Sequence, residues 1–495
     1  MNYSLLWLEM IVALMAVFTL LGDIWVPGES KKWIAQGAAA ILGMLALSAL
    51  FQTDVASVNF GFNGLYVQDD LAALFKVFFL SAAAIVLLMS AEYSGRFGSA
   101  ATEFYSLVLF ALVGMMLAAS ANDLIMMFVS LELITVTFYI LTSYQKNRSA
   151  SLEAGVKYLI MGALASAFMV FGIALIFGTA NTTSFTEIFA KQKELANVPL
   201  FLVGLLFVLV GLGFKIAAFP FQIWAPDVYQ GSPAPATAFL AVGSKAAGFV
   251  LLLRVLFTAV PAVAARWHGL FIVMSGATIL YGSLCAIPQR SIKRLMGYSS
   301  IANAGYLLLG VSASSGDGAN GVMYYLLGYL FTVLGAFTVL SIILSETESD
   351  DITALAGLGQ RSPVLAGVLT LSMASLAGIP PLAGFFGKFL LLKSVLTYAG
   401  SSPAYVALAA IALIGVVISL YYYFGVVRSM YWGAATDFTR INLSGGAKVA
   451  LLACVVGMLW LGVFPNGAMG RINSAGSVLK CASPLKTAVV AEAKK

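Results

Sequence analysis

Long apolar stretches alternate with short polar segments along the whole chain. Each apolar stretch is long enough to cross the hydrocarbon core of a bilayer, which takes about 20 residues of helix. None shows the period-2 alternation of barrel strands, so the backbone polar groups must be satisfied inside helices. The pattern predicts an all-α polytopic membrane protein with about fourteen transmembrane helices, over 4–25, 34–52, 70–92, 102–120, 123–143, 154–178, 198–222, 234–258, 268–287, 296–314, 320–344, 363–398, 404–432 and 446–464.

Two of these stretches contain helix-breaking residues. Residues 363–398 are too long for one simple crossing and hold two adjacent prolines in the motif SLAGIPPLAGFFGK. Each proline removes a backbone donor and clashes with the preceding turn, so we expect a broken helix near 376–388. A second broken helix is expected near 211–222, where the interrupting residues are Gly211, Gly213 and Pro220.

The two expected breaks organise the predicted domains. Five spans separate them, so equivalent units around the breaks would have opposite membrane orientations. We therefore expect two inverted five-helix repeats, each containing a broken helix, as in transporters with sites near the bilayer midplane. The more polar stretch 182–195 is expected to form a short surface helix. The predicted parts are an N-terminal three-helix segment (1–100), a first inverted repeat (101–258), a second inverted repeat (259–432), and a last transmembrane helix with a C-terminal tail (433–495).

The composition supports this class and leaves no room for a soluble domain. Of 495 residues, 61% are hydrophobic and 10% are charged. The formal charge of +6 would suggest nucleic-acid binding in a soluble protein, but here the basic residues lie mainly in short loops, where they set orientation. The first apolar stretch lacks a basic leader and a small-residue cleavage site, so we expect a retained helix there and not a signal peptide.

Lysine and arginine are concentrated in the odd-numbered loops between the predicted spans. The positive-inside rule places those loops in the cytoplasm and both termini on the outer side. The C-terminal tail is also basic, but it follows the last span and weighs less than the short loops. The even-numbered loops hold only Lys191, Lys193 and Arg266, whereas the odd-numbered loops hold Lys31, Lys32, Arg96, Lys146, Arg148, Lys157, Arg290, Lys293, Arg294, Arg361, Arg428, Arg440 and Lys448.

Four titratable residues lie in the interior of apolar spans. Glu132 lies in the fifth span, Lys215 and Lys388 lie next to the expected breaks, and Lys245 lies in the span after the first break. A charge near the bilayer centre costs roughly 2.5 to 3.5 kcal/mol on insertion scales, which indicates a buried polar path or partner. We interpret these residues as a proton relay in which Glu132 pairs with a lysine. A neutral buried carboxyl and purely structural ion pairs are the alternatives.

The other charged residues near the spans are interpreted as peripheral. Lys76, Arg254 and Lys393 lie closer to helix ends and are expected to snorkel to the interface. Asp227, in the motif WAPDVYQG, is expected in a cytoplasmic turn, either as a turn-forming side chain or with a functional role. The single histidine, His268, is expected at the outer interface. Three acidic residues near span ends are expected to be solvated: Glu9, Glu103 and Asp123.

Motifs of several common catalytic sites are absent from the sequence. It holds no Walker loop, dinucleotide fingerprint on a βαβ unit, HExxH pair or haem-attachment motif. Its cysteines, Cys285, Cys454 and Cys481, have neither C-x-x-C nor metal-ligand spacing. We therefore expect no redox site, metal or cofactor in this chain. Its work would be driven by an ion gradient or by partner subunits.

The chain resembles the antiporter-like membrane subunits of respiratory complex I, the bacterial NADH:quinone oxidoreductase. Three motifs carry the resemblance: GFKIAAFPFQIWAPDVYQGSPAPATAFLAVGSKAAG, SIKRLMGYSSIANAGYLLLG and GIPPLAGFFGKF. The similarity covers essentially the whole chain. The residues of the motif DVYQGSPAPATAFL resemble the N-type subunits more than the L and M types. The predicted fourteen spans without a C-terminal lateral helix also fit the N type.

The resemblance implies a role for each buried charge. Glu132 and Lys215 would form a glutamate–lysine pair, Lys245 would be the central lysine, and Lys388 would be the lysine of the second broken helix. With trapped water, these groups would form a hydrophilic axis along the membrane plane, joined to each surface by half-channels.

Two positions depart from the family pattern. The family usually has histidine where this chain has Gln222 and Asn303. Neither side chain titrates near neutral pH, so protons would need water or hydroxyl groups to pass these points. Tyr306 and Ser300 are the candidate hydroxyls.

As a member of this family, the chain is expected to translocate protons while quinone is reduced elsewhere in the complex. FMN, iron–sulfur clusters and quinone are expected in partner subunits, with a second antiporter-like subunit among its membrane neighbours and no nucleic acid. The expected location is the bacterial inner membrane. Two other interpretations stay open: a subunit of a multi-subunit cation/proton antiporter, and a structural membrane subunit with inert buried charges.

Overall fold

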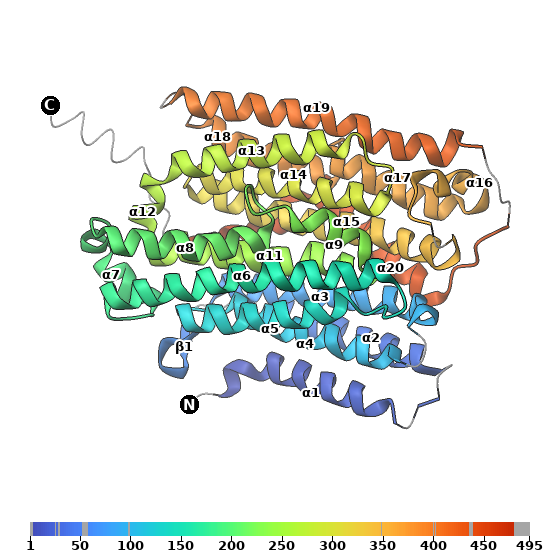
Figure 1. Cartoon of the computed structure of the whole chain (residues 1–495), viewed down its shortest axis with the longest axis horizontal. Coiled ribbons are helices and arrows are strands. Elements are labelled where there is room, and N and C mark those ends of the chain that lie inside the picture. Colours follow the sequence, from blue (N-terminus) through green and yellow to red (C-terminus); the bar gives the residue numbers. More distant parts are fainter. Residues whose placement is uncertain are drawn as a thin grey trace.

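The computed structural model describes residues 3–24, 26–27, 30–51, 58–97, 100–347, 349–398, 400, 402–434 and 439–479. The predicted tail from 480 onward, with Cys481, lies outside this range. Within the described residues the chain is nearly all helical, and its long helices run side by side (Figure 1). One two-stranded antiparallel hairpin pairs Phe60 with Val67.

Among the described residues of the first half of the chain, two α-helices precede the β-hairpin and a series of helices follows it. Carboxylate caps begin two of the helices: Asp69 accepts a hydrogen bond from the Ala72 N–H (2.8 Å), and Asp123 accepts one from the Ile125 N–H (2.7 Å). The elements are η1 (Tyr3–Leu6), α1 (Trp7–Gly22), α2 (Lys31–Phe51), β1 (Asn59–Gly61), η3 (Phe62–Gly64), β2 (Tyr66–Gln68), α3 (Asp70–Glu92), η4 (Ser94–Arg96), α4 (Ala101–Ala119), α5 (Leu124–Thr142), α6 (Ser149–Ala180), α7 (Phe185–Leu195), α8 (Pro199–Ile216), α9 (Trp224–Gly231), α10 (Ala234–Phe239), η6 (Leu240–Ser244), α11 (Lys245–Arg254), η7 (Val255–Ala259) and α12 (Pro261–Arg266).

The second half is helical throughout its described residues. Ser291 caps the first of its buried helices by accepting a hydrogen bond from the Arg294 N–H (3.2 Å). The elements are α13 (His268–Ala286), α14 (Ile292–Ser312), α15 (Gly316–Thr347), η8 (Ile352–Leu355), α16 (Leu358–Arg361), α17 (Pro363–Ala377), α18 (Ala383–Leu396), α19 (Pro403–Trp432), α20 (Gly445–Val463) and α21 (Pro465–Ser477).

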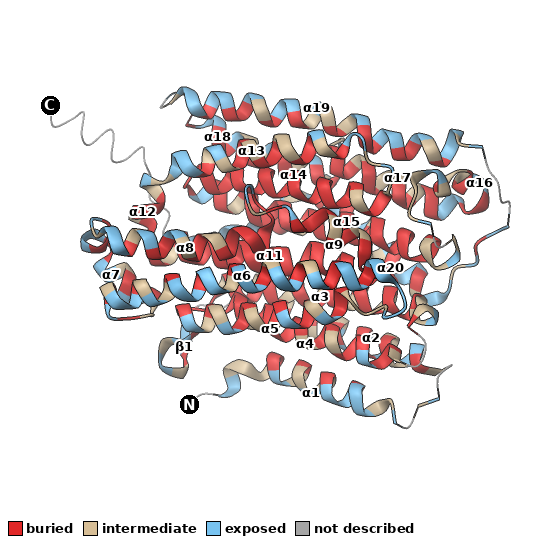
Figure 2. Ribbon diagram, in the orientation of Figure 1, coloured by how far each residue is buried: buried red, intermediate tan, exposed pale blue. Residues whose placement is uncertain are grey.

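The core lies along the middle of the bundle. The continuous run from α10 to η7 is buried throughout, and α14 and α15 are buried over most of their lengths (Figure 2). Helices α1, α6 and α19 expose apolar side chains on their outer faces. The charged groups of the α10–η7 run, Lys245 and Arg254, are therefore enclosed by protein.

The described residues contain twelve helices that are long and apolar enough to cross a bilayer. Helix α14, and α17 together with α18, occupy the two other predicted spans. The polar stretch 182–195 contains helix α7, as predicted. The total of fourteen crossings, the inverted repeats and the four-part division of the chain stay predictions.

Both expected helix breaks are present, and the first lies in the second half of its predicted range, around Pro220. Helix α8 ends at Ile216 with Ala217 in the left-handed conformation, and α9 begins at Trp224. Gly211 and Gly213 lie inside α8 and do not interrupt it. A Cβ at Gly211 would lie 2.3 Å from the Met169 Cε atom, so this glycine allows close packing and does not break the helix.

The second break falls within the predicted range. Helix α17 ends at Ala377, Gly378 has a φ of +90°, and α18 begins at Ala383. A left-handed residue after a helix end is a common way to stop a helix, and glycine adopts it without steric cost. The two halves of this broken helix pack closely, because a Cβ at Gly384 would lie 1.9 Å from the Ser375 carbonyl oxygen.

We predict that Gly384→Ala destabilises the broken helix by about 1–3 kcal/mol, because the added methyl group has no room beside α17. The matched control is Gly367→Ala in α17, where nothing lies within 4 Å of the added Cβ. That control should gain up to about 1 kcal/mol of helix propensity. The measurement is the thermal unfolding midpoint of the purified assembly, and equal midpoints for the two variants would contradict the prediction.

Candidate functional site

Lys215 lies in the last turn of α8, just before the first break. Its side chain is buried, and its ammonium donates to the Thr135 hydroxyl of α5 (2.8 Å) and to the Tyr158 hydroxyl of α6 (3.4 Å). A positive charge in the last turn of a helix is favoured by the helix dipole. The break therefore places Lys215 where both neutral hydroxyls and the helix end stabilise its charge.

Glu132 is half-buried on α5 and does not contact Lys215 directly. Its carboxylate accepts a hydrogen bond from the Ser166 hydroxyl of α6 (2.5 Å). Thr135, which binds the lysine, lies three residues further along the same helix. Among the described residues, Glu132 and Lys215 therefore do not form the expected direct contact. Each binds a hydroxyl instead: Glu132 that of Ser166, and Lys215 that of Thr135.

Lys245 follows a π-helical segment, η6, at the start of α11. Such bulges in helices are frequent at functional sites. Its buried ammonium donates to the Ser300 carbonyl oxygen (2.6 Å) and also to the Ser300 hydroxyl, which in turn is hydrogen-bonded to Tyr229 (2.8 Å). Ser300 is therefore the direct partner of the central lysine.

Helix α14 carries a row of buried polar side chains at three-residue spacing: Ser300, Asn303 and Tyr306. This spacing places them on one side of the helix, about 4.5 Å apart along its axis. The Asn303 oxygen accepts a hydrogen bond from the Tyr325 hydroxyl of α15 (2.6 Å). The row begins at Lys245 and extends toward the second broken helix.

Lys388 closes the row at its other end. Its ammonium donates to the carbonyl oxygens of Leu376 (2.6 Å) and Ala377 (3.4 Å), at the end of α17. It also lies 4.6 Å from the centroid of the Tyr306 ring, a distance typical of a cation–π contact. The second break thus supplies free carbonyls to a lysine, and Tyr306 joins that lysine to α14.

Of the four neutral residues that were considered along the proton path, the structure brings three together and places Gln222 elsewhere. Ser300, Asn303 and Tyr306 belong to the row between Lys245 and Lys388. Gln222 lies apart, in the segment between α8 and α9. It is buried, and its amide oxygen has no hydrogen-bond partner among the described residues.

Sequence reasoning missed the neutral partners of the charges. Lys215 is hydrogen-bonded to Thr135 and Tyr158. Glu132 is hydrogen-bonded to Ser166, and Asn303 to Tyr325. Each is a hydroxyl-bearing residue inside an apolar span, which is the signal that could have identified it. Single hydroxyls are common in membrane helices, however, so the signal alone does not say which of them face a charge.

Four residues predicted to be peripheral are buried: Lys76, Arg254, Glu9 and Asp123. Lys76 and Arg254, each 1% exposed, form ion pairs with Glu9 and Asp69 and do not snorkel. Glu9 is therefore not solvated, and neither is Asp123, which caps α5. Snorkelling fails because each cation has a buried carboxylate within reach. The residues exposed as predicted are Lys393, Glu103 and His268.

Asp227 lies in a helix, α9, and not in a turn. Its carboxylate contacts Lys157 of α6 (2.7 Å) and Arg294 of α14 (2.7 Å), so it ties three helices together. Burial alone would raise the pKa of Asp227, but hydrogen bonds and charge from Lys157 and Arg294 outweigh it, and its pKa is lowered. These ion pairs fix α9, which carries Tyr229, against α6 and α14.

A family model described as the membrane-spanning subunit of NADH:quinone oxidoreductase and Mrp antiporters matches residues 121–419. The match covers both broken helices and the four predicted relay residues, Glu132, Lys215, Lys245 and Lys388. The chain belongs to this family. It is thus an antiporter-like membrane subunit.

Two curated relatives of this antiporter-like subunit carry the name NADH-quinone oxidoreductase subunit N. The one from Desulforamulus reducens is 37% identical, over 96% of this chain and 98% of the relative. The one from Desulfitobacterium hafniense is 40% identical, over 96% and 99%. A solved chain of respiratory complex I from Thermus thermophilus, with bound aureothin, is 33% identical with a TM-score of 0.77, covering 94% of this chain and 99% of that one. The predicted resemblance to N-type subunits is confirmed.

We predict that Asp227→Asn loosens α9 in this antiporter-like subunit at neutral pH. A carboxylate with a lowered folded-state pKa adds stability that is present above its unfolded pKa of about 3.9, and that is lost as pH falls through the folded-state pKa. The thermal unfolding midpoint of the variant should therefore lie below that of the unmodified protein at pH 7. The two midpoints should converge as pH is lowered through about 3.9.

The control for this pH series is Asp317→Asn, at an exposed carboxylate. It should leave the midpoint unchanged across the series. A deficit in Asp227→Asn that persists unchanged in acid would contradict the assigned ion pairs.

Proposed function

We propose that this chain is the proton-translocating membrane subunit of a multi-subunit NADH:quinone oxidoreductase. Quinone reduction takes place elsewhere in the complex, and the relay within this chain is Glu132, Lys215, Lys245 and Lys388. The observation that carries the proposal is the row of buried donors and acceptors that joins the two central lysines. Lys245 binds Ser300, and Lys388 lies against Tyr306, two turns along the same helix.

The chemistry of the partners supports a relay. An ammonium has three donors and no acceptor, so it gives a proton only to an acceptor that faces it. The three lysines of the proposed relay face hydroxyl or carbonyl oxygens, and hydroxyls such as Ser300 and Tyr229 both donate and accept. Protonation of one lysine changes the free energy of protonating the next lysine, because electrostatic interactions are strong in a low-dielectric interior.

The proposed surroundings follow from the family. FMN, iron–sulfur clusters and quinone belong to partner subunits, and another antiporter-like subunit lies beside this one in the membrane. This chain itself would hold no redox catalytic site. The complex would lie in the bacterial inner membrane, with both termini of this chain on the periplasmic side, because basic loops favour the cytoplasm.

A cation/proton antiporter subunit is the second candidate, because the matching family model also describes Mrp antiporters. The two functions differ in partners. Purification of the native assembly distinguishes them: flavin and iron–sulfur subunits that copurify support the first function, and an assembly without them supports the second.

We predict that Lys388→Met lowers NADH-driven proton uptake into proteoliposomes by about tenfold or more, since a positioned proton-transfer group typically contributes two to four orders of magnitude to rate. Lys215→Ala should act in the same direction. The matched control is Lys393→Met, which removes an exposed lysine from the same helix as Lys388. It should pump normally.

These variants also separate a relay from a structural role. Inert buried charges predict that Glu132→Gln and Lys388→Met reduce assembly or stability without changing the protons moved per NADH in assembled complexes. A Lys215→Ala complex that assembles and pumps normally would rule out the relay.

A further inference from the structure

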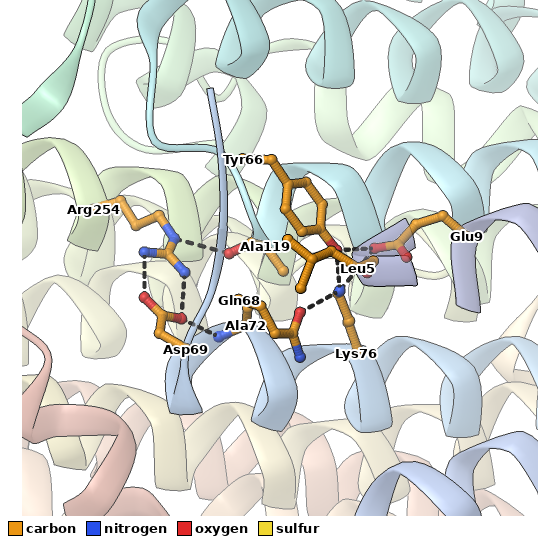
Figure 3. Close-up of polar contacts among 9 residues, drawn as sticks. All are labelled: Leu5, Glu9, Tyr66, Gln68, Asp69, Ala72, Lys76, Ala119 and Arg254. Atoms are coloured by element: carbon orange, nitrogen blue, oxygen red, sulfur yellow. Dashed lines mark hydrogen bonds and ion pairs between the residues drawn. The ribbon is translucent and has the colours of Figure 1, made fainter. Parts of the chain in front are cut away.

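Two buried ion pairs lie outside the relay, where the N-terminal segment meets α11 (Figure 3). One joins Arg254 of α11 to Asp69, the cap of α3. The other joins Lys76 of α3 to Glu9 of α1 (2.8 Å). All four side chains are nearly inaccessible to solvent. None of these four residues belongs to the proposed relay. The free energy that it costs to bury their charges therefore needs another explanation.

The Arg254–Asp69 pair is a fixed contact. Arg254 donates to both carboxylate oxygens of Asp69 (2.8 and 3.0 Å) and to the Ala119 carbonyl oxygen (2.8 Å). Asp69 also accepts the Ala72 N–H. A guanidinium keeps its proton at any physiological pH, and this one has a partner for each nitrogen. The pair therefore holds α3 against the helix that begins with Lys245.

The Lys76–Glu9 pair has a different chemistry. The Lys76 ammonium donates to the Tyr66 hydroxyl (2.5 Å) and to the Gln68 side-chain oxygen (2.7 Å), and Tyr66 donates to Glu9 (3.0 Å). Burial, and then the charge of Glu9, raise the pKa of Tyr66, so its hydroxyl keeps its proton. The second oxygen of Glu9 is buried with no hydrogen-bond partner among the described residues. It is available to take a proton.

A cavity of about 160 Å³ leads to this second pair. The buried Lys76 and the Gln68 side chain line one part of it, and the exposed residues Ser4 and Asn59 line another. This volume is large enough for several water molecules. Apolar side chains make up the rest of the lining, so Ser4, Asn59, Gln68 and Lys76 are the polar residues along the cavity.

We propose that Glu9, Tyr66 and Lys76 form a proton-exchange site on the outer side of the membrane, served by this cavity. The proposal rests on the proposed function, because a translocating subunit must exchange protons with the outer face. The N–H bond of Lys76 breaks and the proton passes either to cavity water or to Glu9, where an O–H bond forms and both side chains become neutral. The reverse step restores the ion pair. The charged and titratable groups facing Lys76 are Glu9, Tyr66, Asp69 and Arg254.

The site can influence the relay through α11. Lys245 and Arg254 are nine residues apart on this helix, or about 13 Å along its axis. A change of charge at Lys76 is felt by the Arg254–Asp69 pair and hence at the end of the helix that carries Lys245. The Arg254–Asp69 pair therefore links the proposed exchange site to the helix that carries Lys245.

The test uses Lys→Arg exchanges in the complete complex reconstituted into proteoliposomes. Lys76→Arg keeps the charge but cannot release a proton. Lys393→Arg makes the same exchange at an exposed lysine of α18 and is the matched control. We expect proton uptake per NADH oxidised to fall by about tenfold or more in Lys76→Arg and to be retained in Lys393→Arg.

A double variant, Glu9→Gln with Lys76→Met, covers the case in which arginine does not fit at position 76. It removes both charges together and leaves no unpaired buried ion. The proposal predicts that the assembled double variant loses proton uptake as Lys76→Arg does. A merely structural pair predicts the opposite, a double variant that assembles and pumps normally.

The reference variant is Lys215→Ala. Normal proton uptake in Lys76→Arg and in the double variant, with loss in Lys215→Ala, would overturn the exchange site and leave the proposed function standing. Normal uptake in Lys215→Ala would instead overturn the proposed function.

Discussion

The structure depends on a supply of free oxygen atoms for lysines that are buried in apolar helices. The carbonyls of a continuous helix already accept hydrogen bonds from N–H groups four residues further on, so an ammonium can only share one of them, as Lys245 shares the Ser300 carbonyl. A helix that stops inside the bundle leaves its last carbonyls free. Lys388 binds two such carbonyls at the end of α17. Lys215 lies in the last turn of α8 and binds the hydroxyls of Thr135 and Tyr158.

The buried cations are held in two ways that differ in their consequences for proton transfer. Lys245 and Lys388 bind neutral oxygens, so loss of a proton changes the net charge of the site and is felt by neighbouring charges. Lys76 binds a carboxylate, so a proton moved to Glu9 leaves the net charge unchanged. Arg254 also binds a carboxylate but cannot take part in transfer. The described cations thus include lysines held by neutral oxygens, a lysine held by a carboxylate and an arginine held by a carboxylate.

Much of the fold was predictable because membrane helices are specified by length and composition. The four buried titratable residues were predictable for the same reason, since a charge inside an apolar stretch is visible in the sequence. The exact end of α8 was not, because Gly211 and Gly213 lie inside that helix and a glycine that breaks a helix looks the same in a sequence. Asp227 was placed in a turn because of Pro226, yet proline is tolerated in the first turn of a helix such as α9.

The contacts between distant segments could not be predicted. Glu9 and Lys76 are 67 residues apart, and each by itself resembles an interfacial charge. Only the packing of α1, the hairpin and α3 turns them into a buried pair. The same holds for Ser166 and Glu132, where the hydroxyl becomes a partner because α6 lies against α5. Pairings of this kind belong to tertiary structure and leave no local pattern.

The two amides at positions where the family usually has histidine have different consequences. Asn303 lies inside the row on α14, where its oxygen accepts from Tyr325 and its nitrogen donates to Ser299 (3.4 Å). An amide orients its neighbours but does not take up and release a proton as imidazole does near neutral pH. Protons that pass this point must therefore travel through hydroxyls or water beside it, and Tyr325 is the hydroxyl in contact. Gln222 lies off the row, in the segment between α8 and α9, so the contacts of Lys245 and Lys388 do not include it.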